Sequence, residues 1–70
     1  MKLSYHPDTD SLYIELSPTV STESDEIAEG IVLDFDAHGK LVGIDIDNAS
    51  HKLDLKEVST DRLPLRASAA

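Results

Sequence analysis

Two aspartates and a glycine stand between two apolar runs in VLDFDAHGKLVGI, residues 32–44, where they could bind a metal ion or act as an acid–base pair. A calcium loop needs a run of oxygen ligands that ends in a bidentate glutamate. Here leucine and valine occupy ligand positions, and the stretch DFDAHGKLVGID ends in an aspartate. The pattern favours a tight turn closed by Gly39, and no metal site is predicted.

The other residues that could do chemistry are equally scattered. The three histidines, His6, His38 and His51, lack the close spacing of a transition-metal pair. No serine lies in the Gly-x-Ser-x-Gly turn of a hydrolase, and the glycines form no phosphate loop. We therefore expect no catalytic residue, no cofactor and no metal, although an enzyme site assembled from two subunits stays open.

The composition describes a short, acidic chain without cysteine. Its 70 residues carry 14 acidic and six basic side chains, a formal charge of −8. Nucleic acid is not an expected direct ligand, because binding it requires a surface that neutralises phosphates. The acidity fits either a basic protein partner or solubility alone. A thin core without disulfides also makes a homo-oligomer an expectation.

The ends of the chain bear on location and domain organisation. The opening MKLSYHPDTD has no apolar run that could serve as a secretory signal or membrane span, so a cytoplasmic location is expected. One small domain is expected over residues 1–58. Residues 59–70 contain a proline and end in small residues, which predicts a flexible tail.

Apolar residues alternate on both sides of a polar break in LSYHPDTDSLYIEL, residues 3–16, which predicts a β-hairpin. One register places the apolar side chains on one face and a charge pair on the other. The predicted pairs are Tyr5 with Leu12, Leu3 with Ile14, Ser4 with Tyr13, and Lys2 with Glu15.

A second hairpin is expected around residues 36–39, DAHG, taken as a four-residue loop. A three-residue loop is disfavoured because it would set Asp34 beside Val42 on the buried side. This register places the carboxylates of Asp34 and Asp45 on the outer face, more than ~10 Å apart. The predicted pairs are Phe35 with Lys40, Leu33 with Val42, Ile31 with Ile44, Asp34 with Leu41, and Asp45 with Gly30.

Two further elements complete the predicted fold. Thr22–Ile27, rich in acidic residues, reads as a charged edge strand of unknown register. Ser50 is expected to cap a short helix over residues 51–58 that sets Leu53 and Val58 against the sheet, although the alternation of Leu53 and Leu55 leaves a strand open. The expected fold is α+β: an antiparallel β-meander of four to five strands with a short C-terminal helix packed on one face.

A patch on the outer face of this sheet is the candidate partner-binding surface. In the predicted registers Tyr13, Val32 and Leu41 point outward among carboxylates, a pattern found at contact surfaces. Gly43 would leave room there for a ring, such as that of Tyr13 or one from a second subunit, or else mark a twist or bulge. The candidate residues are Tyr13, Val32, Asp34, Leu41, Gly43 and Asp45.

Three stretches of the chain together resemble a family of small bacterial proteins, domain of unknown function 2283. They are LSYHPDTDSLYIEL, EIAEGIVLDFD and GKLVGIDIDNAS, and the likeness runs over roughly residues 1–53. His6 and Phe35 depart from the family's usual aspartate and tyrosine. The resemblance implies a small antiparallel sheet with a terminal helix, and it brings no catalytic residue or cofactor. Members of the family are associated with gene neighbourhoods that resemble toxin–antitoxin pairs, so the resemblance also implies an antitoxin-like role as one option.

The functional expectation is therefore a non-catalytic protein–protein interaction module, which binds a basic protein, for example a toxin-like one, through its acidic outer face. The alternative is a self-associating structural protein with no separate partner, whose outer patch meets its own copy.

Overall fold

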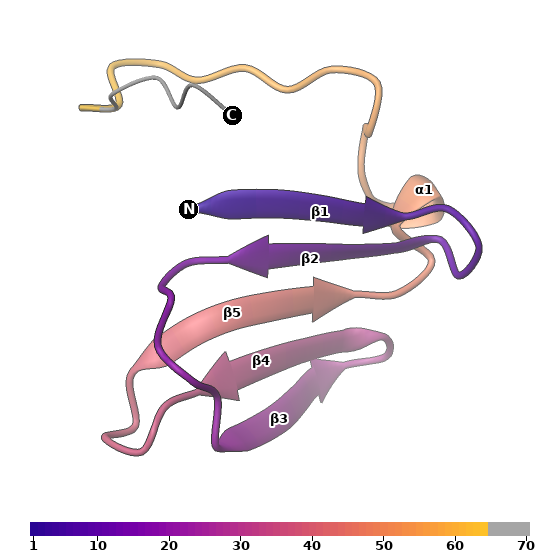
Figure 1. Ribbon diagram of the computed structural model, residues 1–70. Helices are drawn as coiled ribbons and strands as arrows, with labels where there is room; N and C mark the ends of the chain where they lie inside the picture. The colour runs from indigo at the N-terminus through magenta and orange to yellow at the C-terminus, as the bar shows by residue number, and fades with distance from the viewer. Residues whose placement is uncertain (65–70) are drawn as a thin grey trace.

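In the computed structural model, residues 1–64 are described and form one antiparallel sheet with a short helix (Figure 1). The sheet has five strands, within the four to five that were predicted, so the fold is of the α+β class and mostly β. Its elements are β1 (Lys2–His6), β2 (Ser11–Glu15), β3 (Glu23–Ala28), β4 (Ile31–Phe35), β5 (Leu41–Ile46) and α1 (Ala49–Lys52).

The order of the strands is β1-β2-β5-β4-β3, so the prediction of a simple meander is wrong. The segment between β2 and β3 passes the ends of β5 and β4 to reach the far edge of the sheet (Figure 1). All six residues of β3 are exposed, whereas every residue of β5 is buried or half-buried. The apolar strand therefore takes the centre, and the charged strand takes an edge, where carboxylates stay in water.

The first hairpin has the predicted register. Tyr5 pairs with Leu12, Leu3 with Ile14, and Lys2 with Glu15. The alternation of apolar residues and the charge pair specify the same alignment, which explains why this register could be derived from the sequence.

The register predicted for the second hairpin is wrong. The Asp36 amide donates to the Lys40 carbonyl (2.9 Å), which closes a loop of three residues ending at Gly39 (φ 78°). The register then shifts once more: Phe35 pairs with Leu41, but Asp34 pairs with Gly43. This bulge returns Asp34 to the outer face, so the objection to a three-residue loop does not apply.

The remaining pairs follow from this shift. Leu33 lies opposite Ile44, Ile31 opposite Ile46, and Asp45 opposite Val32. The edge strand predicted at Thr22–Ile27 is present one residue later, as β3, and has a bulge of its own between Glu26 and Ala28.

The predicted helix is largely absent, and its packing on a face of the sheet is not seen. The helix α1 has four residues and ends at Lys52. Beyond it, the Asp54 carboxylate accepts a hydrogen bond from the Lys56 amide (3.1 Å), a local turn that competes with a helix. Leu53 and Val58, expected to lie against the sheet, are 39% and 70% exposed. A strand over residues 51–58 is not formed either.

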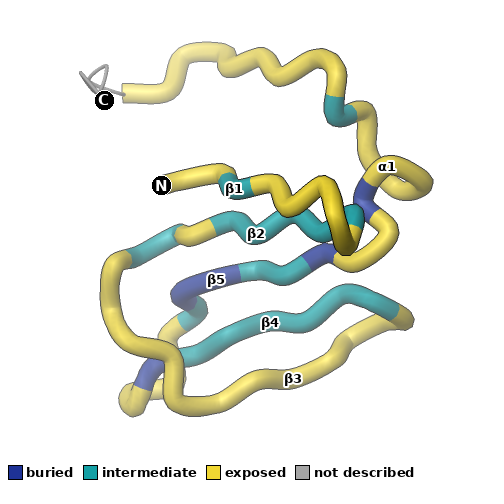
Figure 2. Tube along the Cα trace, turned by 45° about the vertical axis from the view of Figure 1, so that its right-hand side comes forward, coloured by how far each residue is buried: buried dark blue, intermediate teal, exposed yellow. Residues whose placement is uncertain are grey.

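The sheet is a single layer (Figure 2), and the strand pairings give its two faces different side chains. Alternation along the paired strands places the apolar side chains on one side, here named the apolar face: Leu3, Tyr5, Leu12, Ile14, Ile31, Leu33, Phe35, Val42, Ile44 and Ile46. The opposite side, the acidic face, carries Glu15, Glu26, Asp34 and Asp45. Among the described residues only Val42, Ile46 and Ala49 form a buried apolar core.

Residues 53–64 pass beyond the edge strand β1 in both views (Figures 1 and 2), and α1 lies at the end of the sheet. Neither segment covers the centre of the apolar face. Half of the predicted tail, residues 59–64, falls here, and its residues 65–70 lie outside the described part of the chain.

Candidate functional site

The acidic face is organised around the ring of Tyr13, which lies across Gly43 on the neighbouring strand. A Cβ atom at residue 43 would stand 1.9 Å from the Tyr13 hydroxyl oxygen. Glycine therefore makes room for the ring, which was one of the two roles predicted for it. The alternative role was a twist or bulge at Gly43; Gly43 itself pairs with Asp34, and the register shift lies in the next pairing, between Asp34 and Phe35.

The Tyr13 hydroxyl extends past Gly43 to the next strand but one. It donates a hydrogen bond to Oδ2 of Asp34 (3.0 Å), and the Ser24 hydroxyl donates to Oδ1 of the same carboxylate (2.6 Å). Side chains of β2, β4 and β3 are thus joined over the central strand. This chain fixes Asp34 from both sides and leaves Tyr13 half-buried.

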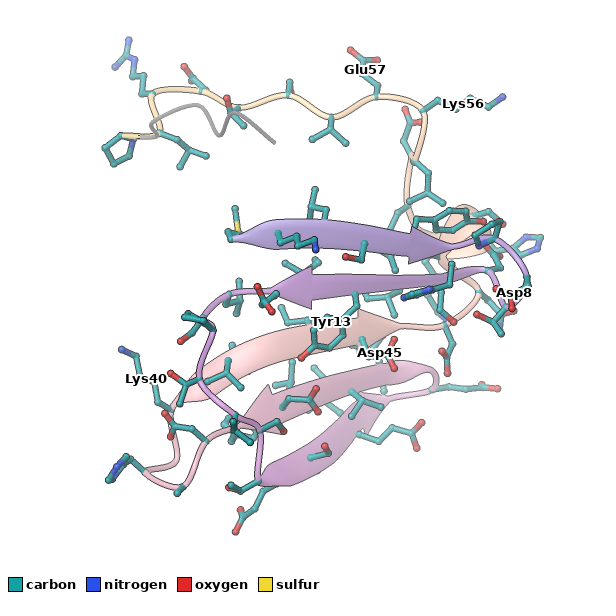
Figure 3. All side chains as sticks on the ribbon, in the orientation of Figure 1. Asp8, Tyr13, Lys40, Asp45, Lys56 and Glu57 are labelled. Atoms are coloured by element: carbon teal, nitrogen blue, oxygen red, sulfur yellow. The ribbon has the colours of Figure 1, made fainter. Side chains whose placement is uncertain are left out.

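Asp45 lies beside the hydrogen bonds that join Tyr13, Asp34 and Ser24, and its pKa is affected by its neighbours. It pairs with Tyr13 of β2 (Figure 3). On its other side it pairs with Val32 of β4. Burial, followed by the charges of Asp47 and Asp34, raises the pKa of Asp45 above its usual range. Asp34 and Asp45 are diagonal neighbours, about 7–8 Å apart between Cα atoms, closer than the separation of more than ~10 Å predicted from spacing.

Five of the six candidate residues are brought together. Tyr13, Gly43 and Asp34 are in direct contact, and Asp45 and Val32 pair next to them. Leu41 is the exception: it lies opposite Phe35 at the bulge, not opposite Asp34. The predicted position of Leu41 in the patch is therefore wrong, because the bulge displaces it.

The surroundings of Tyr13 disfavour ionisation of its phenol. Burial, then the hydrogen bond to Asp34 and nearby carboxylate charges, raise the pKa of Tyr13 above 10.0. At neutral pH its hydroxyl can donate a hydrogen bond, and it serves to hold a carboxylate in place.

A second cluster, at the end of the first hairpin, was missed in the sequence. Asp10 has a positive φ of 53°, and its carboxylate accepts hydrogen bonds from the Tyr5 hydroxyl (2.8 Å), the Ser50 hydroxyl (2.7 Å) and the Ser50 amide (3.1 Å). These bonds lower the pKa of Asp10, those of Ser50 most. Ser50, predicted as the helix cap, lies inside α1, and Asp10 provides the cap from 40 residues away.

The aspartate of the second turn has a structural role of the predicted kind. Asp36, 7% exposed, accepts hydrogen bonds at Oδ1 from the amides of His38 (2.8 Å) and Lys40 (2.9 Å). The Lys40 amide, followed by that of His38, lowers the pKa of Asp36. This carboxylate closes its own turn.

Within residues 1–64, no group of three or more acidic, histidine or cysteine side chains is placed to hold a metal ion. The same residues enclose no detectable cavity. None of their helices has the length and apolar character needed to cross a bilayer.

No curated protein and no solved structure gave a significant match. A family model matches residues 2–50, the span from the first strand to the start of α1, which contains all five strands and the whole acidic face. This chain therefore belongs to the family described as "Protein of unknown function (DUF2283)".

Proposed function

We propose that this protein is a non-catalytic protein–protein interaction module that presents its acidic face to a basic partner protein. The observation that carries the proposal is the single-layer sheet (Figure 2), whose acidic face holds Tyr13 and Asp34 in place by hydrogen bonds. An open sheet surface of this kind suits contact with another macromolecule.

The charges of the acidic face support a basic partner. Four different strands, β2 to β5, each contribute one carboxylate to this face: Glu15, Glu26, Asp34 and Asp45. In the described part of the chain the one ion pair joins Arg62 and Asp61, so none of these four carboxylates forms an ion pair there, although Lys2 lies opposite Glu15. Burial, followed by the charges of Asp47 and Asp34, raises the pKa of Asp45, and a cationic partner would offset the part that these charges contribute.

The centre of the acidic face is suited to a specific contact. The half-buried Tyr13 and Val32 lie between the carboxylates and offer apolar area. Hydrogen bonds hold Tyr13 and Asp34 in place before binding, which reduces the entropy lost on association. Such a partner can be a basic toxin, and the protein would then act like an antitoxin.

A pull-down from lysate of the native host tests this proposal, with washes at low and high salt and mass spectrometry of the bound proteins. One stoichiometric basic protein, released by salt, is the expected result. Asp45→Lys should lower the association rate of that protein about tenfold, because complementary charge mainly accelerates encounter. The matched control is Glu57→Lys, which makes the same charge change outside the strands.

Equal association rates for the two charge-reversed variants would refute the role of the acidic face. Recovery of only untagged copies of the chain would instead favour the self-associating structural protein as the function.

A further inference from the structure

We propose that the apolar face binds the apolar face of a second copy of this chain, so that two sheets stack into a β-sandwich dimer. This inference concerns the side of the sheet opposite to the acidic face. It does not depend on the function proposed above.

The protomer exposes more surface than a folded monomer of its size. Its accessible surface is 5746 Å² for 7.6 kDa, whereas the scaling law for monomers gives about 4,300 Å². The extended residues 53–64 and the uncovered apolar face both contribute to the excess. Covering about half of that excess would bury roughly 700 Å² per protomer, an ordinary interface size.

The side chains at the centre of the apolar face lack a second layer. Val42 and Ile46, near the two ends of β5, are buried, whereas Leu12, Ile14, Leu33 and Ile44 at the centre are only half-buried. Sheets that bury such a face do so against another layer about 10 Å away. The protomer by itself supplies no such layer.

Within residues 1–64 no segment lies over the centre of this face. Residues 53–64 pass beyond β1 (Figure 1), and Leu53 and Leu63 are 39% and 49% exposed. The family match ends at residue 50. We therefore assign the covering layer to another molecule.

Charge distribution favours a second copy as that molecule. The centre of the apolar face is uncharged, whereas the carboxylates of Asp34 and Asp45 project from the opposite face. In a face-to-face dimer the two acidic faces point away from each other, separated by more than the ~8 Å over which salt screens charge at physiological ionic strength. Two like-charged chains can then associate without strong repulsion.

The edge strand β3 constrains the symmetry. Glu23 pairs with Phe35 and Asp25 with Leu33, which places both carboxylates on the rim of the apolar face. A two-fold axis parallel to the strands stacks β5 on β5 and sets β3 of each protomer over β1 of its partner, and so keeps these carboxylates apart. Leu3 of β1 then faces the acidic rim of the other protomer.

Sedimentation equilibrium of the full chain over a range of concentrations tests the dimer. The molar mass measured for the wild type should be twice the 7.6 kDa of one chain. Leu3→Glu should weaken dimerisation at least tenfold, because it adds a charge to the interface opposite Glu23 and Asp25. Ser4→Glu, its neighbour on the acidic face, makes the same charge change and should leave dimerisation unaltered.

Leu3 is already 47% exposed in the protomer, so its substitution removes little internal packing, and circular dichroism checks that both variants fold. A monomeric wild type overturns the proposal. So does a dimer that Leu3→Glu leaves intact, or one that both variants weaken equally, because either result places the interface elsewhere.

Discussion

The Tyr13 ring lies so close to Gly43 that any side chain at residue 43 would overlap its hydroxyl end. Glycine usually weakens a strand by about 0.5–1 kcal/mol relative to alanine. Here it permits the tyrosine of β2 to extend over β5 and bond Asp34 on β4. The contact accounts for an otherwise unfavourable residue in the central strand.

Gly43→Ala should lower the free energy of unfolding by about 1–3 kcal/mol, because the ring must move and the hydrogen bond to Asp34 is lost. Urea denaturation at one fixed protein concentration measures this loss. In a Tyr13→Ser background the same alanine should be neutral or stabilising, since the obstacle is gone. Equal losses in both backgrounds would show that the ring is not the cause.

Both tyrosines should ionise above pH 10 in the folded protein. Burial and Asp34 raise the pKa of Tyr13, and the hydrogen bond to Asp10 raises that of Tyr5. Because each folded pKa exceeds the unfolded one, the stabilisation is complete below the unfolded pKa of 10.0 and is lost as pH rises through the folded pKa. Alkaline absorbance titration measures the pKa values of the two tyrosines. In the Tyr13→Phe variant only the transition of Tyr5 remains, which assigns the missing transition to Tyr13. A Tyr13 midpoint at or below that of the denatured chain would contradict the bond to Asp34.

Asp45→Asn should stabilise the protein at pH 7 by about 0.5 kcal/mol. The folded pKa of Asp45 is raised by burial and by Asp47 and Asp34, so its charged form destabilises the fold above that pKa. The gain should shrink as pH falls through the folded pKa and vanish below the unfolded value of 3.8, where the wild-type carboxyl is neutral too.

Thermal unfolding of the two proteins over this pH range measures the gain from Asp45→Asn. Asp8→Asn serves as the control, since it removes an exposed carboxylate outside the strands. An equal gain from the control would assign the effect to net charge alone.

Removing the Asp10 carboxylate should release α1 from the first hairpin. Asp10→Gly suits the positive φ of this position, so it isolates the side-chain bonds to Ser50 and Tyr5. We expect a loss of about 1–2 kcal/mol, as for other helix caps. Amide hydrogen exchange at Ser50 should accelerate, whereas Asp8→Gly in the same turn should leave it unchanged.

Acid should reproduce this effect in the wild type. The folded pKa of Asp10 is lowered by Ser50 and Tyr5, so its stabilisation is present above the unfolded value of 3.8 and is lost as pH falls through the folded pKa. The amide exchange rate of Ser50 is compared above and below this pH range after correction for the intrinsic exchange rate at each pH. Equal corrected rates would show that the carboxylate of Asp10 does not form the cap.

The sequence was sufficient where local patterns agreed with one another. In the first hairpin the alternation and the pair Lys2–Glu15 specify one register, and the acidic strand β3 was correctly assigned to an edge. The glycine at residue 39 likewise marked the second turn correctly. These features depend on neighbouring residues alone.

The errors arise where distant or irregular structure decides. The bulge at Leu41 shifts the second hairpin in a way that no alternation pattern records. The pairing of β2 with β5 brings Asp45 beside Tyr13, and the contact of Asp10 with Ser50 spans 40 residues. Of the candidate site, the ring over Gly43 was foreseen as one option, but its link to Asp34 and Ser24 depended on that shift.

The strand order has a consequence for how the chain folds. The central strand β5 is the last one to leave the ribosome, and it must insert between β2 and β4. Until then the two earlier hairpins have no shared partner, and the inner edges of β2 and β4 stay open to other nascent chains. Completion of the sheet therefore depends on residues 41–46, and a chain that stops before them has the parts of the fold without the strand that joins them.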